Sequence, residues 1–584
     1  MPSVLRPRYL LVLLALVVGL AACADRKTTR DTEEAEVDAI EEVAQDRDAN
    51  EAPSAPPPPA TEPLHIRGGR ADYYVDGVRV QAGSATRQGD ESWRYAPPVD
   101  REGYAPLDEI GFRRVADAPL STFSIDVDRA SYANTRRMLT DGYLPPSAAV
   151  RIEEFVNYFE YGYAGPEGEH PFAVHTEVAE SPWNAEHRLV RIALQGERLD
   201  TESLPPSNLV FLLDVSGSMN SPDKLPLLAN AFRLLTNELR PQDRVAIVVY
   251  AGAAGLVLEP TPGDEKQTIL AALNRLRAGG STAGGAGIQL AYATARRTFN
   301  PNGNNRVILA TDGDFNVGAS SDAAMQELIE EERESGIFLS VLGFGTGNLQ
   351  DSKMETLADH GNGNYSYIDS MREAHKVFVR EFGGTLVAIA KDVKVQVEFN
   401  PAAVAGYRLI GYENRMLRDE EFNDDTRDAG ELGAGHRVTA LYEIVPHGAT
   451  TALAGIDSLR YQTTTLSPEA GSGELLTVKL RYKPATGPGQ FADESVLLSQ
   501  AVADAEGSAE QASESFRWAA AVAEFALVLR QSEYAEGASY DEALALARSA
   551  RGQDRDGDRA EFIQLVEIAR SLDQRGEPVQ ALRD

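Results

Sequence analysis

The stretch that decides the fold is Asn208-Leu209-Val210-Phe211-Leu212-Leu213, followed directly by Asp214-Val215-Ser216-Gly217-Ser218-Met219. Its first part is almost entirely apolar, which predicts a strand that is covered on both faces. One carboxylate and two hydroxyls then follow at alternate positions, at Asp214, Ser216 and Ser218. Oxygen ligands on a loop that leaves a buried strand suit a hard divalent cation, whereas zinc prefers nitrogen and sulfur ligands. Alone, this triplet predicts a metal site and a capped strand end equally well.

Strands and helices alternate from residue 205 to residue 388. Apolar runs predict strands at 209–213, 245–250, 307–310, 338–342 and 365–368, with helices between them. Repeated strand–helix units predict an α/β fold, which is a doubly wound, Rossmann-like domain with a parallel central sheet. Ligands bind such sheets beyond the carboxyl ends of the strands, which is where the sequence places Asp214.

Two further fragments carry oxygen ligands in the same domain. Thr282 ends the glycine-rich run Gly279-Gly280-Ser281-Thr282, and Asp312 follows the apolar strand at 307–310. If the sheet is parallel, Asp312 emerges at the same edge as Asp214. The sequence therefore predicts a five-residue metal site of Asp214, Ser216, Ser218, Thr282 and Asp312.

These five residues match, in order and in context, the metal-ion-dependent adhesion site of von Willebrand factor type A (VWA) domains. The resemblance covers about residues 205–385. The flanking motifs around 128–134, 157–159, 428–431 and 438–443 resemble one subgroup of bacterial VWA lipoproteins. By this resemblance, Ser216 and Ser218 ligate the metal through their hydroxyls, and Thr282 binds it directly or through water. Asp214 and Asp312 act partly through water and through hydrogen bonds to the ligands.

The resemblance implies a binding module that is not an enzyme. Bound Mg²⁺, with Mn²⁺ and Ca²⁺ as alternatives, keeps one open position that captures an Asp or Glu carboxylate of a protein partner, for adhesion or complex assembly. One alternative is a scaffold in which the metal only stabilises the domain. Another is a metal-dependent hydrolase, although the sequence shows no general base beyond the two site aspartates.

The N-terminus predicts a lipid-anchored envelope protein. Arg6 and Arg8 precede an apolar run that ends in Leu20-Ala21-Ala22-Cys23, and Cys23 is the single cysteine of the chain. This pattern is typical of a signal peptide, here residues 1–22, and it resembles a bacterial lipobox, whose cysteine is lipidated. Ala24 resembles an outer-membrane sorting signal, which favours the outer membrane facing the periplasm over the cell surface or the inner membrane.

Composition divides the rest of the chain. Residues 23–117 are acidic and proline-rich, which predicts a disordered tether. Residues 118–204 predict a small α+β flanking region, and residues 389–584 predict a β-sandwich-like region followed by helices. The net charge of −33 argues against a nucleic-acid partner, because binding to phosphates needs clustered Lys and Arg.

Overall fold

The computed structural model describes most of the chain after residue 101. The described residues are 102–281, 284–313, 315, 322–381, 387–427, 429–457, 460–461, 465–487, 490–505 and 507–576, together with the backbone of 72–75 and 78–81. The predicted signal peptide, Cys23 and Thr282 lie outside them. The chain divides into a unit of residues 1–96, which contains the antiparallel pair β1 (Asp72–Val75) and β2 (Val78–Gln81), and a unit of residues 97–584. All that follows concerns the second unit.

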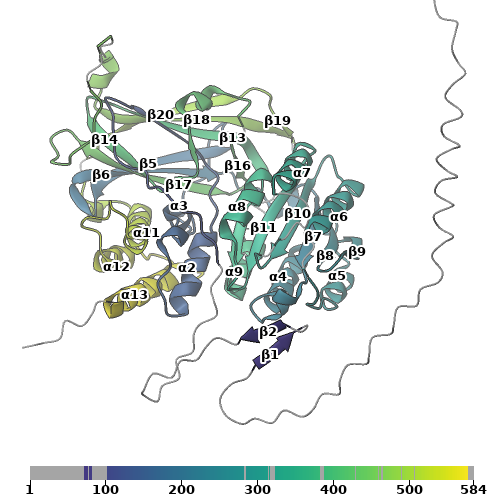
Figure 1. Ribbon diagram of the computed structural model, residues 1–584. Helices are drawn as coiled ribbons and strands as arrows, with labels where there is room; N and C mark the ends of the chain where they lie inside the picture. The colour runs from purple at the N-terminus through teal and green to yellow at the C-terminus, as the bar shows by residue number, and fades with distance from the viewer. Residues whose placement is uncertain are drawn as a thin grey trace, which may run out of the picture. The chain divides into compact units, whose positions relative to one another are not determined.

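The α/β domain is built around a sheet with the strand order β12-β11-β10-β7-β8-β9 (Figure 1). Its strands are β7 (Ser207–Asp214), β8 (Arg244–Tyr250), β9 (Ala254–Pro262), β10 (Asn304–Thr311), β11 (Ile337–Phe344) and β12 (Tyr365–Ile368). Neighbouring strands run parallel from β12 to β8, which confirms the predicted fold class. Strand β9, which the sequence analysis did not predict, runs antiparallel to β8 at the edge. Its Pro260 and Pro262 are tolerated there because an edge strand leaves N–H positions unpaired.

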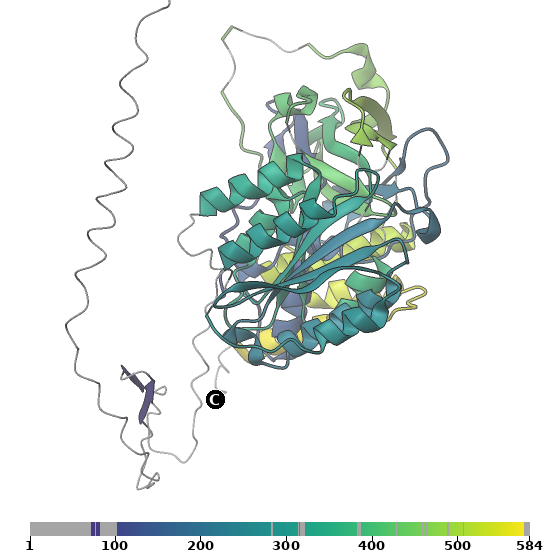
Figure 2. The ribbon, with the colours of Figure 1, turned by 90° about the vertical axis from the view of Figure 1, so that its right-hand side faces the viewer.

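Helices cover both faces of this sheet, and Figure 2 shows the strands between two helical layers. Val210 and Leu212 face a core shared with α6, α7 and α8, whereas Phe211 and Leu213 face a core shared with α4, α5 and α9. This alternation explains why β7 is apolar at nearly every position. The helices are α4 (Leu225–Glu238), α5 (Lys266–Leu273), α6 (Gly284–Arg297), α7 (Asp322–Glu334), α8 (Asp351–His360) and α9 (Met371–His375).

The strands of the two flanking regions pair with each other, which the division along the chain into 118–204 and 389–584 did not anticipate. One sheet has the order β15-β4-β13-β18-β19, with β16 on β13 and β20 on β18, and the other has the order β3-β14-β17-β6-β5. Tyr442 of β17 and Phe123 of β4 contribute to the apolar core between the two sheets. The strands are β3 (Arg113–Arg114), β4 (Leu120–Ser124), β5 (Phe172–Ser181), β6 (Asn184–Gly196), β13 (Ala388–Phe399), β14 (Val404–Ile410), β15 (Met416–Leu417), β16 (Gly430–Gly433), β17 (Arg437–Pro446), β18 (Glu474–Gly487), β19 (Gln490–Phe491) and β20 (Val496–Ala503).

The C-terminal helices pack on the N-terminal ones. Helices α11 (Glu514–Arg530), α12 (Tyr540–Ser549) and α13 (Asp558–Gly576) share one core with α2 (Ala130–Thr140) and α3 (Ile152–Val156). Trp518 of α11 lies edge-on to Phe159 and to Phe562 of α13, with ring centroids 5.3 and 5.2 Å apart. Helix α11 is buried on all sides, as expected for a helix that is apolar all round.

A buried arginine links the N-terminal flanking region, the α/β domain and the C-terminal helices. Arg136 of α2 forms an ion pair with Asp369, which follows β12, at 2.5 Å, and with Glu373 of α9 at 2.8 Å. Its other terminal nitrogen lies 3.1 Å from Glu561 of α13. Because these partners belong to the α/β domain and to the C-terminal helices, the guanidinium holds three segments that are far apart in sequence.

The prediction of a disordered tether over residues 23–117 is wrong for its last part, residues 102–117. Gly103 donates its N–H to the carbonyl of Leu349 at 2.9 Å, β3 pairs with β14, and Val115 is 1% exposed. Residues 102–117 are therefore ordered on the folded unit, because their few apolar side chains find partners that composition alone does not reveal. Among the helices of the described residues, none combines the length and apolar character that crossing a membrane requires.

Replacing Glu524 by Gln is expected to make the protein less sensitive to alkaline pH. Glu524 of α11 is fully buried, and burial raises its pKa to about 8. The unfolded chain releases this proton at a lower pH, so the folded state loses stability as pH rises from about 4.5 toward 8. Glu524→Gln removes that loss, which is on the order of 4 kcal/mol at pH 8. Urea denaturation of both proteins between pH 5 and pH 8.5 measures the difference.

Glu567→Gln on the exposed side of α13 is the matched control, since this carboxylate pairs only at the surface with Arg548. The difference between Glu524→Gln and the parent protein should grow with pH, whereas the control should follow the parent protein throughout. A constant difference across the pH range would contradict the assignment.

Candidate metal site

Asp214 ends β7 and is fully buried. Its Oδ1 accepts a hydrogen bond from the backbone N–H of Ser216 at 2.8 Å, and its Oδ2 accepts one from Thr311 Oγ1 at 3.4 Å. Burial raises the pKa of Asp214 to about 6; hydrogen bonds from Ser216 oppose this shift, and the negative charge of Asp312 adds to it. Asp312 directly follows Thr311, whose hydroxyl bonds to Asp214, so the two predicted site aspartates lie near each other.

The two serine hydroxyls meet directly after the strand. The chain leaves β7 and enters the short helix η3 (Gly217–Asn220), which brings Ser216 Oγ and Ser218 Oγ to 2.9 Å from each other. Ser216 is buried and Ser218 is exposed. The pair therefore joins the buried carboxylate of Asp214 to the protein surface.

Asp312 stands one residue beyond the end of β10 and is fully buried. The next residue, Gly313, adopts a φ of +109°, and a Cβ there would collide with the carbonyl oxygen of Asn348. Glycine is thus required for the chain to turn sharply at the sheet edge. This turn fixes where the Asp312 carboxylate lies.

Lys224 and Asn348 also lie at the predicted site, and the sequence did not reveal either of them. Lys224 Nζ donates to Asp312 Oδ2 at 2.8 Å and to Asn348 Oδ1 at 2.9 Å. One signal for Lys224 was present, since it is the only Lys or Arg between Asp214 and Phe232. No comparable signal marks Asn348, which the fold brings in from the loop after β11.

The glycine-rich loop before Thr282 reaches the predicted site. Gly217 donates its N–H to the carbonyl of Gly280 at 3.0 Å, and Gly279 donates to the carbonyl of Val215 at 2.8 Å. The loop therefore lies against the serine-bearing segment, as the five-residue prediction requires. Thr282 itself lies outside the described residues, so its part in the site stays a prediction.

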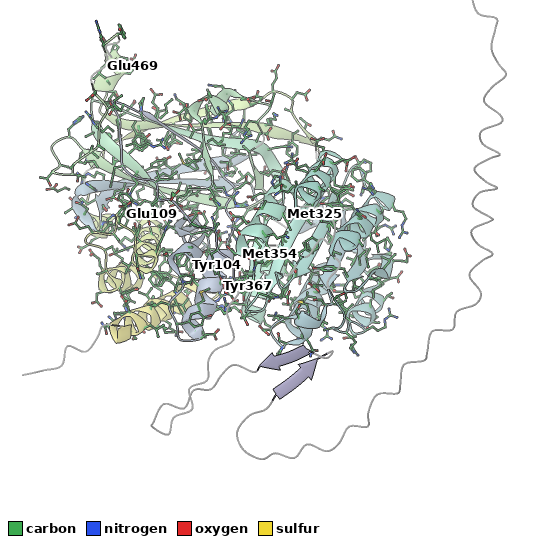
Figure 3. All side chains as sticks on the ribbon, viewed as in Figure 1. Tyr104, Glu109, Met325, Met354, Tyr367 and Glu469 are labelled. Atoms are coloured by element: carbon green, nitrogen blue, oxygen red, sulfur yellow. The ribbon has the colours of Figure 1, made fainter. Side chains whose placement is uncertain are left out.

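The loop after β11, which contains Asn348, is held in place by Glu102 and Gly103. Glu102 accepts a hydrogen bond from the N–H of Gly347 at 3.0 Å, and Gly103 pairs with Gln350. Arg137 of α2 holds Glu102 at 2.7 Å and lies over the ring of Tyr367. Figure 3 labels Tyr367 and Tyr104 at this junction between the N-terminal segment and the α/β domain.

The donors assembled here are two carboxylates and two hydroxyls. In the part of the chain that the structure describes, no three His, Cys, Asp or Glu side chains gather as a metal-binding group. A site rich in hydroxyls is compatible with that finding, because neutral oxygens replace some of the carboxylates. Such oxygen donors fit a hard cation such as Mg²⁺ and do not fit zinc.

Family models match three successive parts of the chain. The model described as von Willebrand factor type A domain matches residues 209–314, which contain all five predicted site residues. The model described as von Willebrand factor matches residues 98–191, and the model described as Uncharacterized protein YfbK, C-terminal, matches residues 384–572.

Individual relatives extend over different shares of the chain. Uncharacterized protein YfbK of Escherichia coli (strain K12) is 44% identical over 474 residues, which are 80% of this chain and 80% of that protein. Uncharacterized protein sll0103 of Synechocystis is 28% identical over 33% of this chain and 45% of that protein. A solved structure, von Willebrand factor type A from Catenulispora acidiphila, is 15% identical and covers 70% of this chain and 98% of that chain, with a TM-score of 0.37.

Replacing Gly313 by Ala is expected to damage the site and the fold together. The added Cβ meets the Asn348 carbonyl, and the φ of +109° is strained for alanine, so the loss should be about 2–4 kcal/mol. Gly142→Ala is the matched control, because Gly142 has a φ of +90° but open space around its Cβ position. That control should lose about 1 kcal/mol. Chemical denaturation that gives equal losses for the two variants would contradict the role of the collision.

Proposed function

Because this chain belongs to the family of VWA domain proteins that carry a YfbK-type C-terminal region, we propose that its α/β domain is a metal-dependent receptor for protein carboxylates. Asp214, Ser216, Ser218, Thr282 and Asp312 hold the cation, which is Mg²⁺ in this proposal. The cation offers one position to an Asp or Glu side chain of a partner protein. The domain acts by binding, and no catalytic step is assigned to it.

The observation that carries this proposal is the spacing of the two hydroxyls. Ser216 Oγ and Ser218 Oγ lie 2.9 Å apart. Adjacent ligands of an octahedral Mg²⁺ with metal–oxygen distances of about 2.0–2.1 Å are separated by about 2.8–3.0 Å. The two hydroxyls, which share a hydrogen bond in the structure, thus have the spacing of neighbouring ligands on one ion, and the Ser216 N–H donates to the Asp214 carboxylate at 2.8 Å.

The surface around the hydroxyls supports capture of an acidic group. Exposed, uncharged residues of three loops lie at this edge of the sheet: Gly217, Ser218, Asn220, Gly252, Ala253, Gly279, Gly280 and Ser281. The exposed charged residues that lead into the last of these loops are the cations Arg275 and Arg277. The chain as a whole carries a net charge of −33. An acidic partner would be repelled over much of such a surface, but among the described residues of these three loops no exposed Asp or Glu opposes the approach of its carboxylate.

Replacing both hydroxyl ligands is expected to weaken metal binding and leave the fold intact. Ser216→Ala combined with Ser218→Ala removes two neutral oxygens and no charge, so the Mg²⁺ affinity should fall at least tenfold. Ser221→Ala is the control, since its hydroxyl bonds to Asp223 and does not contact the site carboxylates. Isothermal titration with Mg²⁺ measures affinity, and melting in EDTA verifies folding.

The carboxylate step is tested separately with glutarate as the probe. Water-proton relaxation of the Mn²⁺-loaded protein should fall as glutarate displaces metal-bound water, and the double variant should show no such change. Metal binding without any glutarate effect would overturn carboxylate capture and favour a scaffold that the metal only stabilises. Normal Mg²⁺ affinity in the double variant would overturn the metal site itself.

We further propose that lipid on Cys23 anchors the protein in the cell envelope, at the outer membrane facing the periplasm. The support is the sequence Leu20-Ala21-Ala22-Cys23 after a basic and apolar segment, with Ala24 following it. Acyl chains partition into a bilayer without a spanning helix. The α/β domain would then present its metal site to other envelope proteins.

Replacing Cys23 by Ser is expected to release the protein from membranes. After expression in Escherichia coli with a radioactive fatty acid, the parent protein should sediment with membranes and carry the label, whereas Cys23→Ser should lose both. Ala24→Asp is the matched variant, which should keep the label and move to the inner membrane. A Cys23→Ser protein that remains labelled and sediments would refute the anchor.

A further inference from the structure

We propose that Lys224 sets the charge of the metal site so that the metal-loaded site keeps a net positive charge for the incoming carboxylate. This inference rests on the proposed function and assigns a specificity-determining role to a residue outside the five predicted ligands. Lys224 would weaken binding of the cation and strengthen binding of the acidic partner. Removing Lys224 should therefore raise the affinity for the cation and lower the affinity for the acidic partner. A simple loss of structure would lower both affinities.

The geometry fixes the ammonium group against one site carboxylate. Lys224 Nζ lies 2.8 Å from Asp312 Oδ2, and Asn348 Oδ1 accepts a second hydrogen bond at 2.9 Å. Lys224 is 7% exposed and Asp312 is fully buried, so water screens this pair little. The lysine stem packs against Gly345, where a Cβ would collide with it. The side chain therefore has little freedom to leave the site.

The formal charges show what this contact does. Asp214, Asp312 and Lys224 together carry a charge of −1, and a divalent cation changes this to +1. Without the lysine, the metal-free cluster would carry −2 and the loaded cluster would be neutral. A neutral cluster attracts a carboxylate only through the local field of the ion, whereas a cluster of +1 also attracts it through net charge.

A purely structural role for Lys224 makes a different prediction. A lysine that only compensates a buried aspartate stabilises the metal-free fold, and its removal would weaken every function of the site. The proposed role requires instead that its removal improves metal binding, because the cation then no longer shares Asp312 with an ammonium. Measurements of the metal and of the carboxylate are therefore both needed.

The test compares Lys224→Met with the parent protein and with Lys266→Met, a lysine at the start of α5 that bonds to the Asn237 carbonyl. We expect Lys224→Met to lower the Kd for Mg²⁺ at least tenfold in isothermal titration. It should also raise the Kd of glutarate for the Mn²⁺-loaded protein at least tenfold in water-proton relaxation. Its melting temperature should rise more on addition of Mg²⁺ than that of the parent protein, because tighter binding stabilises the folded state more.

A second variant changes the charge without touching Lys224 or Asp312. Asn348→Asp places a carboxylate of similar shape beside the ammonium, so the cluster charge falls by one unit, as in Lys224→Met. It should shift both affinities in the same directions. This variant keeps the test decisive if Lys224→Met does not fold.

The outcomes distinguish the inference from the proposed function. If the parent protein binds both Mg²⁺ and glutarate but the charge variants leave the two affinities unchanged or weaken both, the role of Lys224 is overturned and the proposed function stands. If the metal-loaded parent protein does not bind glutarate, the proposed function itself fails. Opposite shifts of the two affinities in both variants would support the inference.

Discussion

The parallel pairing of β7 with β10 is the constraint on which the site depends. Leu213 of β7 lies opposite Ala310 of β10, so both strands end at nearly the same level. The chain leaves β7 toward β8 on one side, and β10 lies on the other, which makes this a point where the winding direction of the sheet changes. Asp214 and Asp312 lie at the same edge of the sheet because buried parallel strands admit no shift in register that keeps their apolar faces covered.

The flanking regions hold this sheet in a larger frame. Strands before and after the α/β domain in sequence pair with each other, and Arg136 ties the domain to the N- and C-terminal helices. Glu102 and Gly103, at the start of the described part of this unit, bind the same loop that carries Asn348. Residues 102 and 103 thus lie beside the loop that carries Asn348 and are held there by backbone and charged contacts.

The charged groups at this edge of the sheet include a buried cation, although the chain as a whole is strongly acidic. Burial raises the pKa of Asp214, and the negative charge of Asp312 adds to this shift. Lys224 pairs with Asp312, and the exposed residues nearest the hydroxyls, Gly217, Gly280 and Ser281, are uncharged. In the proposed function, a divalent cation would bind beside these two carboxylates and offset their charge.

The sequence by itself determined the elements of the α/β domain and the positions of its oxygen donors, because buried parallel strands are apolar throughout and their ends are marked by Asp214 and Asp312. The edge strand β9, with its prolines, escaped detection, since edge strands need no continuous apolar pattern. Only the tertiary structure decided that 102–117 is ordered, that the flanking strands form common sheets, and that Lys224 and Asn348 join the site. Such pairings depend on contacts between residues distant in the chain, which local composition and periodicity do not encode.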